Sequence, residues 1–370
     1  MTSVDNSMQN QTVLIMAGGT GGHVFPALAV AREFLSRNIS VVWLGTHQGI
    51  EAQIIPEAGI PIEWVSVSGI RGKGLLRLIK APFMIALAAW QCFRILLRVK
   101  PRVVVGMGGF VTGPGGVVAR LMAKPLCIHE QNATAGMTNR YLSHIANKVM
   151  QAFPNSFSGR ENVLTTGNPV RETIVKMPEP EFRMKGREGN LKLLVLGGSL
   201  GAQALNEIVP AALSRFPESQ RPIVKHQTGK KNHQQACESY QQEGVEQDIE
   251  VLPFINDMAD AYAWADFVIC RAGALTISEL SAAGIASLLV PYPFAVDDHQ
   301  TKNAHYLVDA GAAYLIQQAE LDADSVYHLL KELSEDRNKL VSMAVSARKL
   351  SKVNAAREVA DQCCAIGGLS

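Results

Sequence analysis

Near its start the chain joins an apolar run to a glycine-rich turn, Val13-Leu14-Ile15-Met16-Ala17-Gly18-Gly19-Thr20-Gly21-Gly22-His23-Val24-Phe25-Pro26. The run predicts a buried parallel strand, and the helical pattern after it places Val24, Leu28, Ala31 and Leu35 on one apolar face. Glycine lets a backbone approach a ligand closely, and a helix start directs free N–H groups toward an anionic or hydroxyl-rich group. The same pattern also suits a tight strand-to-helix turn in any α/β protein.

The spacing of this turn excludes two familiar phosphate-binding motifs. G-x-G-x-x-G requires a glycine where Val24 stands, and a Walker A loop requires a lysine and a hydroxyl residue where His23 and Val24 stand. The next predicted strand ends in Gly45-Thr46 and has no acidic residue to hold an NAD ribose. We therefore expect a dinucleotide-binding type of fold without dinucleotide chemistry.

Size and composition indicate a globular protein of two domains. The 370 residues are 47% hydrophobic and 18% charged, and a net charge of +2 argues against nucleic acid as a partner. The 6 cysteines form no C-x-x-C pair and are expected to be reduced thiols, with no disulfide or zinc framework. The polar residues 1–11 do not have the pattern of a signal peptide.

The second half of the chain repeats the opening pattern. The segment Leu193-Leu194-Val195-Leu196-Gly197-Gly198-Ser199-Leu200-Gly201-Ala202 precedes a helical pattern at Leu205, Ile208, Ala212 and Phe216. Strand-like runs alternating with helices predict an α/β fold of two Rossmann-like domains, whose parallel, doubly wound sheets face a central cleft. The predicted strands are 13–16, 41–44, 103–105, 126–128, 149–152, 193–196, 223–226, 249–252, 267–270 and 287–290.

Another strand-turn-helix pattern runs through residues 266–284, where two roles are open for Glu279. Thr276 and Glu279 match a capping box, in which the carboxylate satisfies the N-terminus of a helix. Alternatively, Glu279 accepts hydrogen bonds from a nucleotide ribose while the N–H groups of the turn meet the phosphates. The polar loop Asp297-Asp298-His299-Gln300 follows the next predicted strand and can hydrogen-bond a polyhydroxyl ligand.

One segment of the first half interleaves basic and apolar residues. The stretch Ile70-Arg71-Gly72-Lys73-Gly74-Leu75-Leu76-Arg77-Leu78-Ile79-Lys80 suits an anionic membrane surface, because its cations meet headgroups while Leu75, Leu76 and Ile79 dip below them. The helical pattern at residues 81–97 is interrupted by Gln91 and Arg94 and is short for a bilayer. We expect it to be a core helix that does not cross the membrane.

Further motifs follow in order along the chain, at residues 17–23, 108–116, 129–132, 167–171, 197–202, 271–276 and 298–300. Together they resemble the MurG family of bacterial glycosyltransferases, from near residue 13 to about residue 304. The resemblance implies a GT-B-type fold and transfer of GlcNAc from UDP-GlcNAc to the MurNAc 4-hydroxyl of undecaprenyl-pyrophosphoryl-MurNAc-pentapeptide, in peptidoglycan synthesis. It also implies a peripheral protein at the cytoplasmic face of the inner membrane.

The resemblance further implies a first domain at 1–168, a UDP-GlcNAc-binding domain at 169–350 and a C-terminal helix within 351–370, the last of a helical stretch near 344–364 that packs back on the first domain. Ser199 would contact the diphosphate, the backbone of Ile255 the uracil, and Glu279 the ribose. Gln300 would bind GlcNAc hydroxyls, and Arg171 would lie at the hinge side of the nucleotide. The implied substrate-binding residues are Thr20, Gly21, Gly22, Asn132, Arg171, Ser199, Ile255, Ala274, Leu275, Thr276, Ile277, Ser278, Glu279 and Gln300.

An inverting transfer requires a base for the attacking hydroxyl and stabilisation of the departing diphosphate. His23, the titratable side chain of the first glycine turn, is the candidate base; alternatively it orients the acceptor or caps the helix. No cofactor is expected and Mg²⁺ is at most stimulatory, since Asp322-Ala323-Asp324 has the pattern of a helix cap and not of a metal site. Two other functions stay open, a UDP-GlcNAc 2-epimerase-like isomerase and a non-catalytic UDP-sugar-binding subunit.

Overall fold

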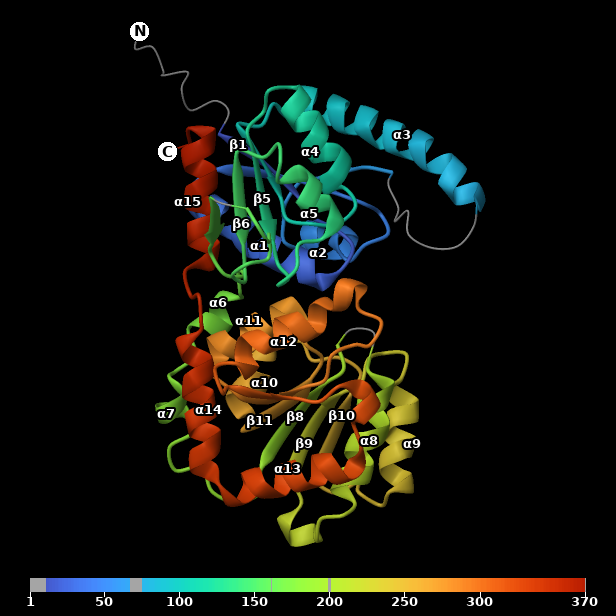
Figure 1. The fold of residues 1–370 in the computed structure, drawn as a ribbon, viewed down its shortest axis with the longest axis vertical. Coiled ribbons are helices and arrows are strands. Elements are labelled where there is room, and N and C mark those ends of the chain that lie inside the picture. The colour runs from blue at the N-terminus through green and yellow to red at the C-terminus, as the bar shows by residue number, and fades with distance from the viewer. Residues whose placement is uncertain (1–10, 67–74, 161, 199–200, 370) are drawn as a thin grey trace. The chain divides into compact units, whose positions relative to one another are not determined.

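The structure is a computed structural model that describes residues 11–66, 75–160, 162–198 and 201–369. The chain forms two compact units, one of residues Met1–Arg171 with Lys352–Ser370 and one of residues Glu172–Ser351. Each unit contains one sheet covered by helices (Figure 1).

The sheet of the first unit has 7 parallel strands in the order β3-β2-β1-β4-β5-β6-β7. The strand order reverses beside β1, and the glycine turn follows β1 at the carboxyl edge, where doubly wound sheets bind ligands. The strands are β1 Thr12–Met16, β2 Ser40–Gly45, β3 Ile62–Trp64, β4 Val103–Gly106, β5 Leu126–Glu130, β6 Lys148–Gln151 and β7 Val163–Thr165. The helices are α1 Gly21–Ser36, α2 Glu51–Glu57, α3 Leu75–Val99, α4 Thr112–Leu121, α5 Met137–Leu142 and, from the chain end, α15 Ala355–Gly367.

The sheet of the second unit has 6 parallel strands in the order β10-β9-β8-β11-β12-β13. Its order reverses beside β8, the strand that precedes the second glycine turn. The strands are β8 Lys192–Leu196, β9 Ile223–Gln227, β10 Ile249–Leu252, β11 Phe267–Cys270, β12 Ala286–Leu289 and β13 Ala313–Leu315. The helices are α6 Glu172–Val175, α7 Pro180–Arg183, α8 Gln203–Leu213, α9 His233–Gln242, α10 Met258–Trp264, α11 Ala274–Ala283, α12 His299–Val308, α13 Ala323–Glu335 and α14 Arg337–Lys349, with short 3₁₀ turns at Glu218–Gln220, Val296–Asp298 and Gln318–Glu320.

Every predicted strand is present, but three strands were not predicted. The missed strands β3, β7 and β13 are 3 residues long and lie at the sheet edges. Edge strands are buried on fewer sides, so they do not need the apolar run that identifies a central strand.

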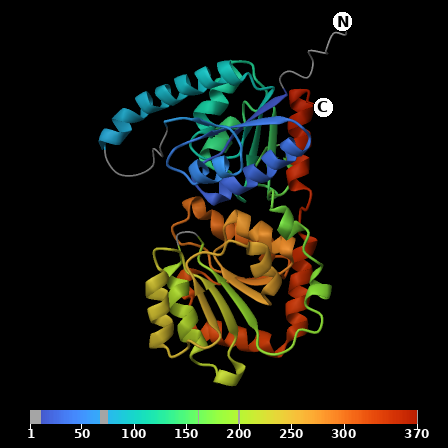
Figure 2. The ribbon, with the colours of Figure 1, turned by 180° about the vertical axis from the view of Figure 1, so that it is seen from behind.

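Both faces of the first sheet are buried by different helices. Val13 and Ile15 of β1 belong to one apolar core with α1 and α15, and Leu14 and Met16 belong to another with α3 and α4. The view from behind shows the C-terminal helix beside the first helix of this unit (Figure 2). The predicted apolar face of α1 is confirmed except at Leu35, whose side chain is exposed in the last turn. In the second unit Phe216 is buried as expected but lies beyond the end of α8.

The chain end contains two helices where one continuous helical stretch was expected. Helix α14 packs on α7, α11 and β12 of the second unit, whereas α15 packs on α1, β4, β5 and β6 of the first. The helix stops at Leu350, whose carbonyl oxygen accepts a hydrogen bond from the Tyr306 hydroxyl at 2.9 Å. The chain then passes Gly167, where an added Cβ would lie 2.3 Å from the Cβ of Lys352. The break is needed because the two helices pack on different units.

Helix α3 corrects the expectation of a core helix at residues 81–97. Only one side of it is in the core, through Ala88, Cys92, Ile95 and Leu96. Its exposed side carries the large apolar residues Phe83, Ile85, Leu87, Trp90, Phe93 and Leu97. By length and composition the segment Pro82–Val99 is able to span a membrane, and 22% of it is buried. The predicted membrane residues Leu75, Leu76 and Ile79 begin α3, and their side chains lie outside the described part of the chain.

Candidate active site

The first glycine turn rests on a buried carboxylate. Glu51 is fully buried at the start of α2 and accepts hydrogen bonds from the backbone N–H of Gly19 at 2.9 Å and of Thr46 at 3.1 Å. The hydroxyl of Thr46 donates to the same carboxylate at 2.8 Å. Thr20 is the exposed N-cap residue of α1 and makes no side-chain cap, so its hydroxyl faces solvent with the first amides of the helix. The carboxylate therefore holds the turn in place from below.

A second pair of glycines packs against this turn from the end of β4. Gly108 and Gly109 have φ values of +98° and +87°, which favour glycine. A Cβ on Gly109 would lie 2.4 Å from the carbonyl oxygen of Gly18, and one on Gly108 would lie 2.4 Å from Nδ1 of His23. The absence of side chains here lets the two loops touch and confines the His23 ring.

A hydrogen-bonded series of side chains connects His23 to the end of β5. Nδ1 of His23 lies 3.0 Å from Oε1 of Gln131, and Nε2 of Gln131 lies 3.1 Å from Nδ1 of His129. Nε2 of His129 lies 2.9 Å from the carbonyl oxygen of Gly167. His129 is fully buried, and this burial lowers its pKa to about 4. The series begins on the first helix and ends at the segment where the chain leaves the first unit.

Asn132, a predicted sugar-binding residue, is positioned by the buried carboxylate of Glu130. Oε1 of Glu130 accepts from the backbone N–H of Asn132 at 2.9 Å and from its side-chain amide at 3.2 Å. The other oxygen of Glu130 accepts from Gly136 at 3.0 Å and from Asn139 at 2.9 Å. Asn132 is half-buried and follows Gln131 directly, so it lies on the same carboxyl edge as His23.

Arg171 approaches the first glycine turn through an aromatic ring. Its guanidinium lies 4.8 Å from the centre of the Phe25 ring, and a Cβ on Gly21 would lie 3.0 Å from that ring. The structure thus gathers the predicted residues Thr20, Gly21, Gly22, His23, Asn132 and Arg171 within the first unit.

The second glycine turn has a similar backbone and different neighbours. Gly198 and Gly201 have φ values of +79° and +78°, and a Cβ on Gly201 would lie 2.3 Å from the carbonyl oxygen of Thr228. Ala202 is the N-cap residue of α8 and makes no side-chain cap. The predicted diphosphate ligand Ser199 lies outside the described residues.

The capping-box interpretation of Thr276 and Glu279 is wrong. Helix α11 begins one residue after its N-cap, Gly273, which makes no side-chain cap, so Thr276 lies inside the first turn. Glu279 lies in the second turn, where its buried Oε2 accepts a hydrogen bond from the Tyr262 hydroxyl at 3.2 Å. The amides of the first turn of α11, at Ala274, Leu275, Thr276, Ile277 and Ser278, are those of the predicted phosphate site.

The polar loop after β12 lies beside α11. Oε1 of Gln300 accepts from the backbone N–H of Tyr292 at 2.9 Å, and the amide of Asn303 donates to the carbonyl of Ala272 at 3.2 Å. Arg271 donates to the carbonyl oxygens of Val290 at 3.2 Å and Pro291 at 3.1 Å, which holds the start of this loop. Ile255, predicted to meet the uracil, is buried in the loop after β10 at the same edge.

The acidic pair at Asp322 and Asp324 is a helix cap, as predicted. Asp322 is the N-cap residue of α13 and accepts from the backbone N–H of Ser325 at 2.7 Å. Among the described residues no group of His, Cys, Asp and Glu side chains is arranged to hold a metal ion.

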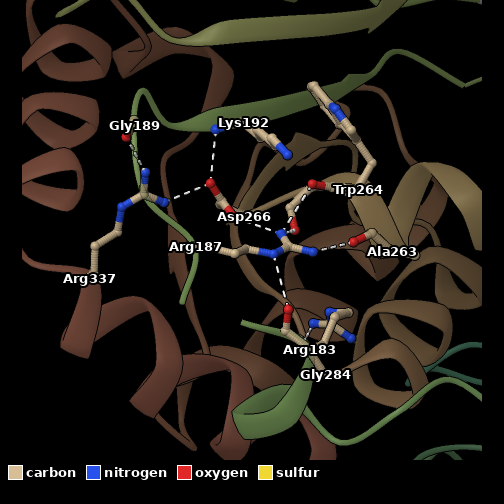
Figure 3. A network of polar contacts seen from close by, with 10 residues as sticks. Arg183, Arg187, Gly189, Lys192, Ala263, Trp264, Asp266, Gly284 and Arg337 are labelled. Carbon is tan, nitrogen blue, oxygen red and sulfur yellow. Dashed lines mark hydrogen bonds and ion pairs between the residues drawn. The ribbon is translucent and has the colours of Figure 1, made fainter. Parts of the chain in front are cut away.

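A network of charged side chains lies at the opposite, amino edge of the second sheet (Figure 3). Asp266 directly precedes β11 and is 2% exposed; its carboxylate lies 2.6 Å from Arg187 and 2.6 Å from Arg337. It also accepts from the backbone N–H of Lys192 at 3.0 Å. Although burial opposes ionisation, these donors hold the pKa of Asp266 below its ordinary value. The network fastens the strand starts, away from the ligand edge.

The sequence analysis missed three residues of the first unit that support the site. They are Glu51, Gln131 and His129, each at most 1% exposed. Glu51 has no motif that distinguishes it from an ordinary helix-start glutamate. His129 and Gln131 belong to a motif that resembles the family, but their contacts with His23 join positions 106 to 108 residues apart, which spacing does not reveal.

Comparisons with known proteins agree with this organisation. The N-terminal domain of glycosyltransferase family 28 matches residues 13–151, and the C-terminal domain of that family matches residues 192–363. Curated relatives from Marinobacter nauticus and Ectopseudomonas mendocina are 52% and 54% identical over 95% of this chain and are covered over 96% and 97% of their own length. Both are named UDP-N-acetylglucosamine–N-acetylmuramyl-(pentapeptide) pyrophosphoryl-undecaprenol N-acetylglucosamine transferase.

Solved structures extend the comparison. The crystal structure of Acinetobacter baumannii MurG matches with a TM-score of 0.81 at 43% identity, over 95% of this chain and 99% of that one. An S. aureus MnaA–UDP structure has a TM-score of 0.68 at 13% identity, over 97% of both chains, and so shares the fold alone. With both family 28 domains present and full-length relatives more than 50% identical, the chain belongs to the MurG family of N-acetylglucosaminyltransferases, with a GT-B-type fold of two Rossmann-like units.

Proposed function

We propose that this chain moves GlcNAc from UDP-GlcNAc to the 4-hydroxyl of MurNAc in undecaprenyl-pyrophosphoryl-MurNAc-pentapeptide, by a single inverting displacement. The hydroxyl oxygen bonds to C1 of the α-linked GlcNAc while the bond from C1 to UDP breaks, so that a β1,4 linkage forms and UDP departs. The names of the full-length relatives support these substrates. One glycine turn in each unit supports a reaction of two substrates.

His23 accepts the proton of the attacking hydroxyl. The observation that carries this assignment is the asymmetry of its ring: Nδ1 is bonded to Gln131, whereas Nε2 has no hydrogen-bond partner among the described residues. The half-buried ring stands at the start of α1 beside the amides of the turn. A positioned base contributes about 10²–10⁴ in rate.

The second unit holds UDP-GlcNAc. The uncapped start of α11 leaves amides for the diphosphate, and Ser199 with its turn adds further contacts. Glu279 accepts from the ribose hydroxyls, the Ile255 backbone meets the uracil, and Gln300 binds GlcNAc. Backbone amides, helix dipoles and Arg171 stabilise the leaving diphosphate, so we expect turnover to persist in EDTA, with Mg²⁺ at most stimulatory.

Incubating the full chain with UDP-GlcNAc tests this function. We expect fast UDP release only when the lipid-linked MurNAc acceptor is added. An epimerase would convert the sugar nucleotide without an acceptor, and a non-catalytic binding subunit would release no UDP under either condition. Either outcome contradicts the proposal.

The exposed side of α3 supports peripheral binding to the cytoplasmic face of the inner membrane. Phe83, Leu87, Trp90 and Leu97 recur at helical spacing and are 75%, 47%, 54% and 50% exposed. Arg94 lies 5.1 Å from the Trp90 ring in the same row. Large apolar side chains next to cations suit a helix lying in an anionic interface, while the opposite side stays packed in the protein core.

Vesicle flotation tests the membrane proposal. Phe83→Glu with Trp90→Glu should abolish binding to vesicles of anionic lipid and leave UDP binding unchanged. Phe182→Glu is the matched control, because Phe182 is 77% exposed but belongs to the second unit. High salt should weaken binding of the unmodified chain, since surface attraction is screened. Continued flotation of the double variant would place the membrane contact elsewhere.

A further inference from the structure

We propose that Gln131 is a positioning residue that sets the tautomer of His23. The series Gly167–His129–Gln131–His23 directs the single proton of the neutral His23 ring to Nδ1 and leaves the lone pair on Nε2. The importance of this tautomer for turnover depends on the proposed role of His23 as base, whereas the tautomer itself does not.

The argument starts from a group whose role is fixed. The carbonyl oxygen of Gly167 can only accept a hydrogen bond, so the His129 nitrogen 2.9 Å away, Nε2, must carry a proton. Burial lowers the pKa of His129 to about 4, so this ring is neutral at physiological pH. A neutral imidazole has one N–H, and Nδ1 of His129 is therefore an acceptor.

Gln131 must then present its amide nitrogen to His129. Nε2 of Gln131 lies 3.1 Å from that acceptor and 3.3 Å from the backbone carbonyl oxygen of His129, which also only accepts. The reversed amide would place its oxygen against two acceptors. Two independent contacts therefore assign the orientation of this amide.

The remaining end of the amide decides the state of His23. Oε1 of Gln131 accepts and lies 3.0 Å from Nδ1 of His23, so Nδ1 carries the proton. The lone pair of the neutral ring is then on Nε2, the nitrogen with no partner among the described residues.

The surroundings keep Gln131 in this orientation. Its side chain is 1% exposed, and its backbone carbonyl accepts from the Asn168 amide at 3.0 Å. The amide of Asn139 holds the carbonyl of His129 at 3.2 Å. Gly108 leaves space for the His23 ring and none for a larger residue, because a Cβ there would lie 2.4 Å from Nδ1. Neither ring can rotate without breaking these contacts.

The chemical consequence is a base aimed by a neutral partner. When the MurNAc hydroxyl attacks, its O–H bond breaks and an Nε2–H bond forms, so His23 becomes an imidazolium. Its Nδ1–H continues to donate to Gln131, whose amide stays neutral. In the other tautomer Nε2 carries the proton and cannot accept one, and an equivalent loss of the correct tautomer in a Ser-His-Asp triad costs about 10⁴-fold in kcat.

Nitrogen-15 NMR of the full chain labelled at histidine tests the proposal directly. The signals of His23 are assigned by their loss in His23→Ala. We expect the neutral His23 ring to be protonated at Nδ1, and His129 to be protonated at Nε2 and to remain neutral down to about pH 5. A neutral His23 protonated at Nε2 in the unmodified protein would overturn the proposal without any variant.

Substitutions of Gln131 give the second arm. Gln131→Leu should convert His23 to a mixture of tautomers and lower kcat by about 10–100-fold, less than complete loss of the base, with KM for UDP-GlcNAc unchanged. Gln131→Glu keeps an acceptor toward His23 and should restore the Nδ1–H tautomer and much of kcat. Gln151→Leu is the matched control, since Gln151 is a buried glutamine of the same sheet bonded to Thr165.

The two arms separate this inference from the proposed function. If His23→Ala retains turnover, His23 is not the base, yet the tautomer assignment still stands or falls on the NMR signals. If His23→Ala loses turnover while Gln131→Leu keeps both the Nδ1–H tautomer and full kcat, Gln131 does not position His23.

Discussion

The two glycine turns of this enzyme have matching backbones and different side chains around them. Each follows the central strand of its sheet and precedes a helix, and Gly19 and Gly198 occupy equivalent positions with φ values of +94° and +79°. Where the first turn has His23, the second has Ala202. Under the first turn lies the carboxylate of Glu51, whereas the second rests on the Thr228 carbonyl oxygen.

The buried carboxylates of the two units also differ in position. Glu51 lies at the carboxyl edge of its sheet beneath the turn, and Asp266 lies at the amino edge of the other sheet among arginines. The comparison indicates that a repeated backbone motif supplies amides for ligands in both units, and that only the first unit adds a side chain able to move a proton. Substitutions at equivalent positions test this difference.

The largest effect is expected from His23→Ala, which gives the first turn the residue that the second already carries. Loss of the base should reduce turnover by about 10²–10⁴-fold, while calorimetry should find UDP affinity unchanged. His144→Ala, an exposed histidine of the same unit, should retain turnover. Near-normal turnover of His23→Ala at saturating acceptor would remove the distinction between the turns.

Asp266→Asn should affect stability and not chemistry. Removing one partner of a buried ion pair costs about 3 kcal/mol, near the low end because Arg187 and Arg337 are partly exposed. Hydrogen exchange at β8 and β11 should become faster, with turnover unchanged below the unfolding temperature. Glu51→Gln, the matched change beneath the first turn, should instead lower turnover. Equal effects of the two variants on turnover would contradict the comparison.

The stabilisation from Asp266 should depend on pH in a defined direction. Its folded pKa is lowered, so the contribution is fully present above the unfolded pKa of about 3.9 and is lost as pH falls through the folded pKa. The stability difference between the unmodified chain and Asp266→Asn should therefore be constant near neutral pH and shrink below about pH 4. A difference that grows on acidification would show that the carboxylate is not stabilised by its arginines.

Glu279→Gln tests whether the second unit uses its carboxylate on the ligand. Loss of charge-assisted hydrogen bonds to the ribose should weaken UDP binding by about 1.5–3 kcal/mol, or roughly 10- to 150-fold, in calorimetry. Tyr262→Phe removes the hydroxyl that bonds Glu279 and separates that contact from the ribose. If Tyr262→Phe alone reproduces the whole loss, the carboxylate serves the protein interior.

The smallest effect is expected where the two turns are most alike. Gly19→Ala and Gly198→Ala add a Cβ that meets nothing within 4 Å, so only the left-handed backbone opposes them. Each should destabilise its turn by about 1 kcal/mol, measured as local hydrogen exchange. A neutral result at one glycine and a loss at the other would show that the backbones are not equivalent.

Much of the fold could be predicted because central strands are buried on both sides. The runs at β1 and β8 have to be apolar, and the glycine turns have to lack side chains, so both features are visible locally. The edge strands β3, β7 and β13 escaped prediction because they need no such run. The exposed side of α3 was mistaken for core because apolar composition alone does not say which neighbour covers it.

The sequence by itself determined the α/β class, the two strand-turn-helix starts and the family, because these depend on residue types at short spacing. Only the tertiary structure decided which side chains act together. Glu51 reaches Gly19 across 32 positions, and Gln131 reaches His23 across 108. Parallel strands bring their carboxyl ends to one edge whatever their separation in the chain, so contacts made there are set by strand order and not by spacing.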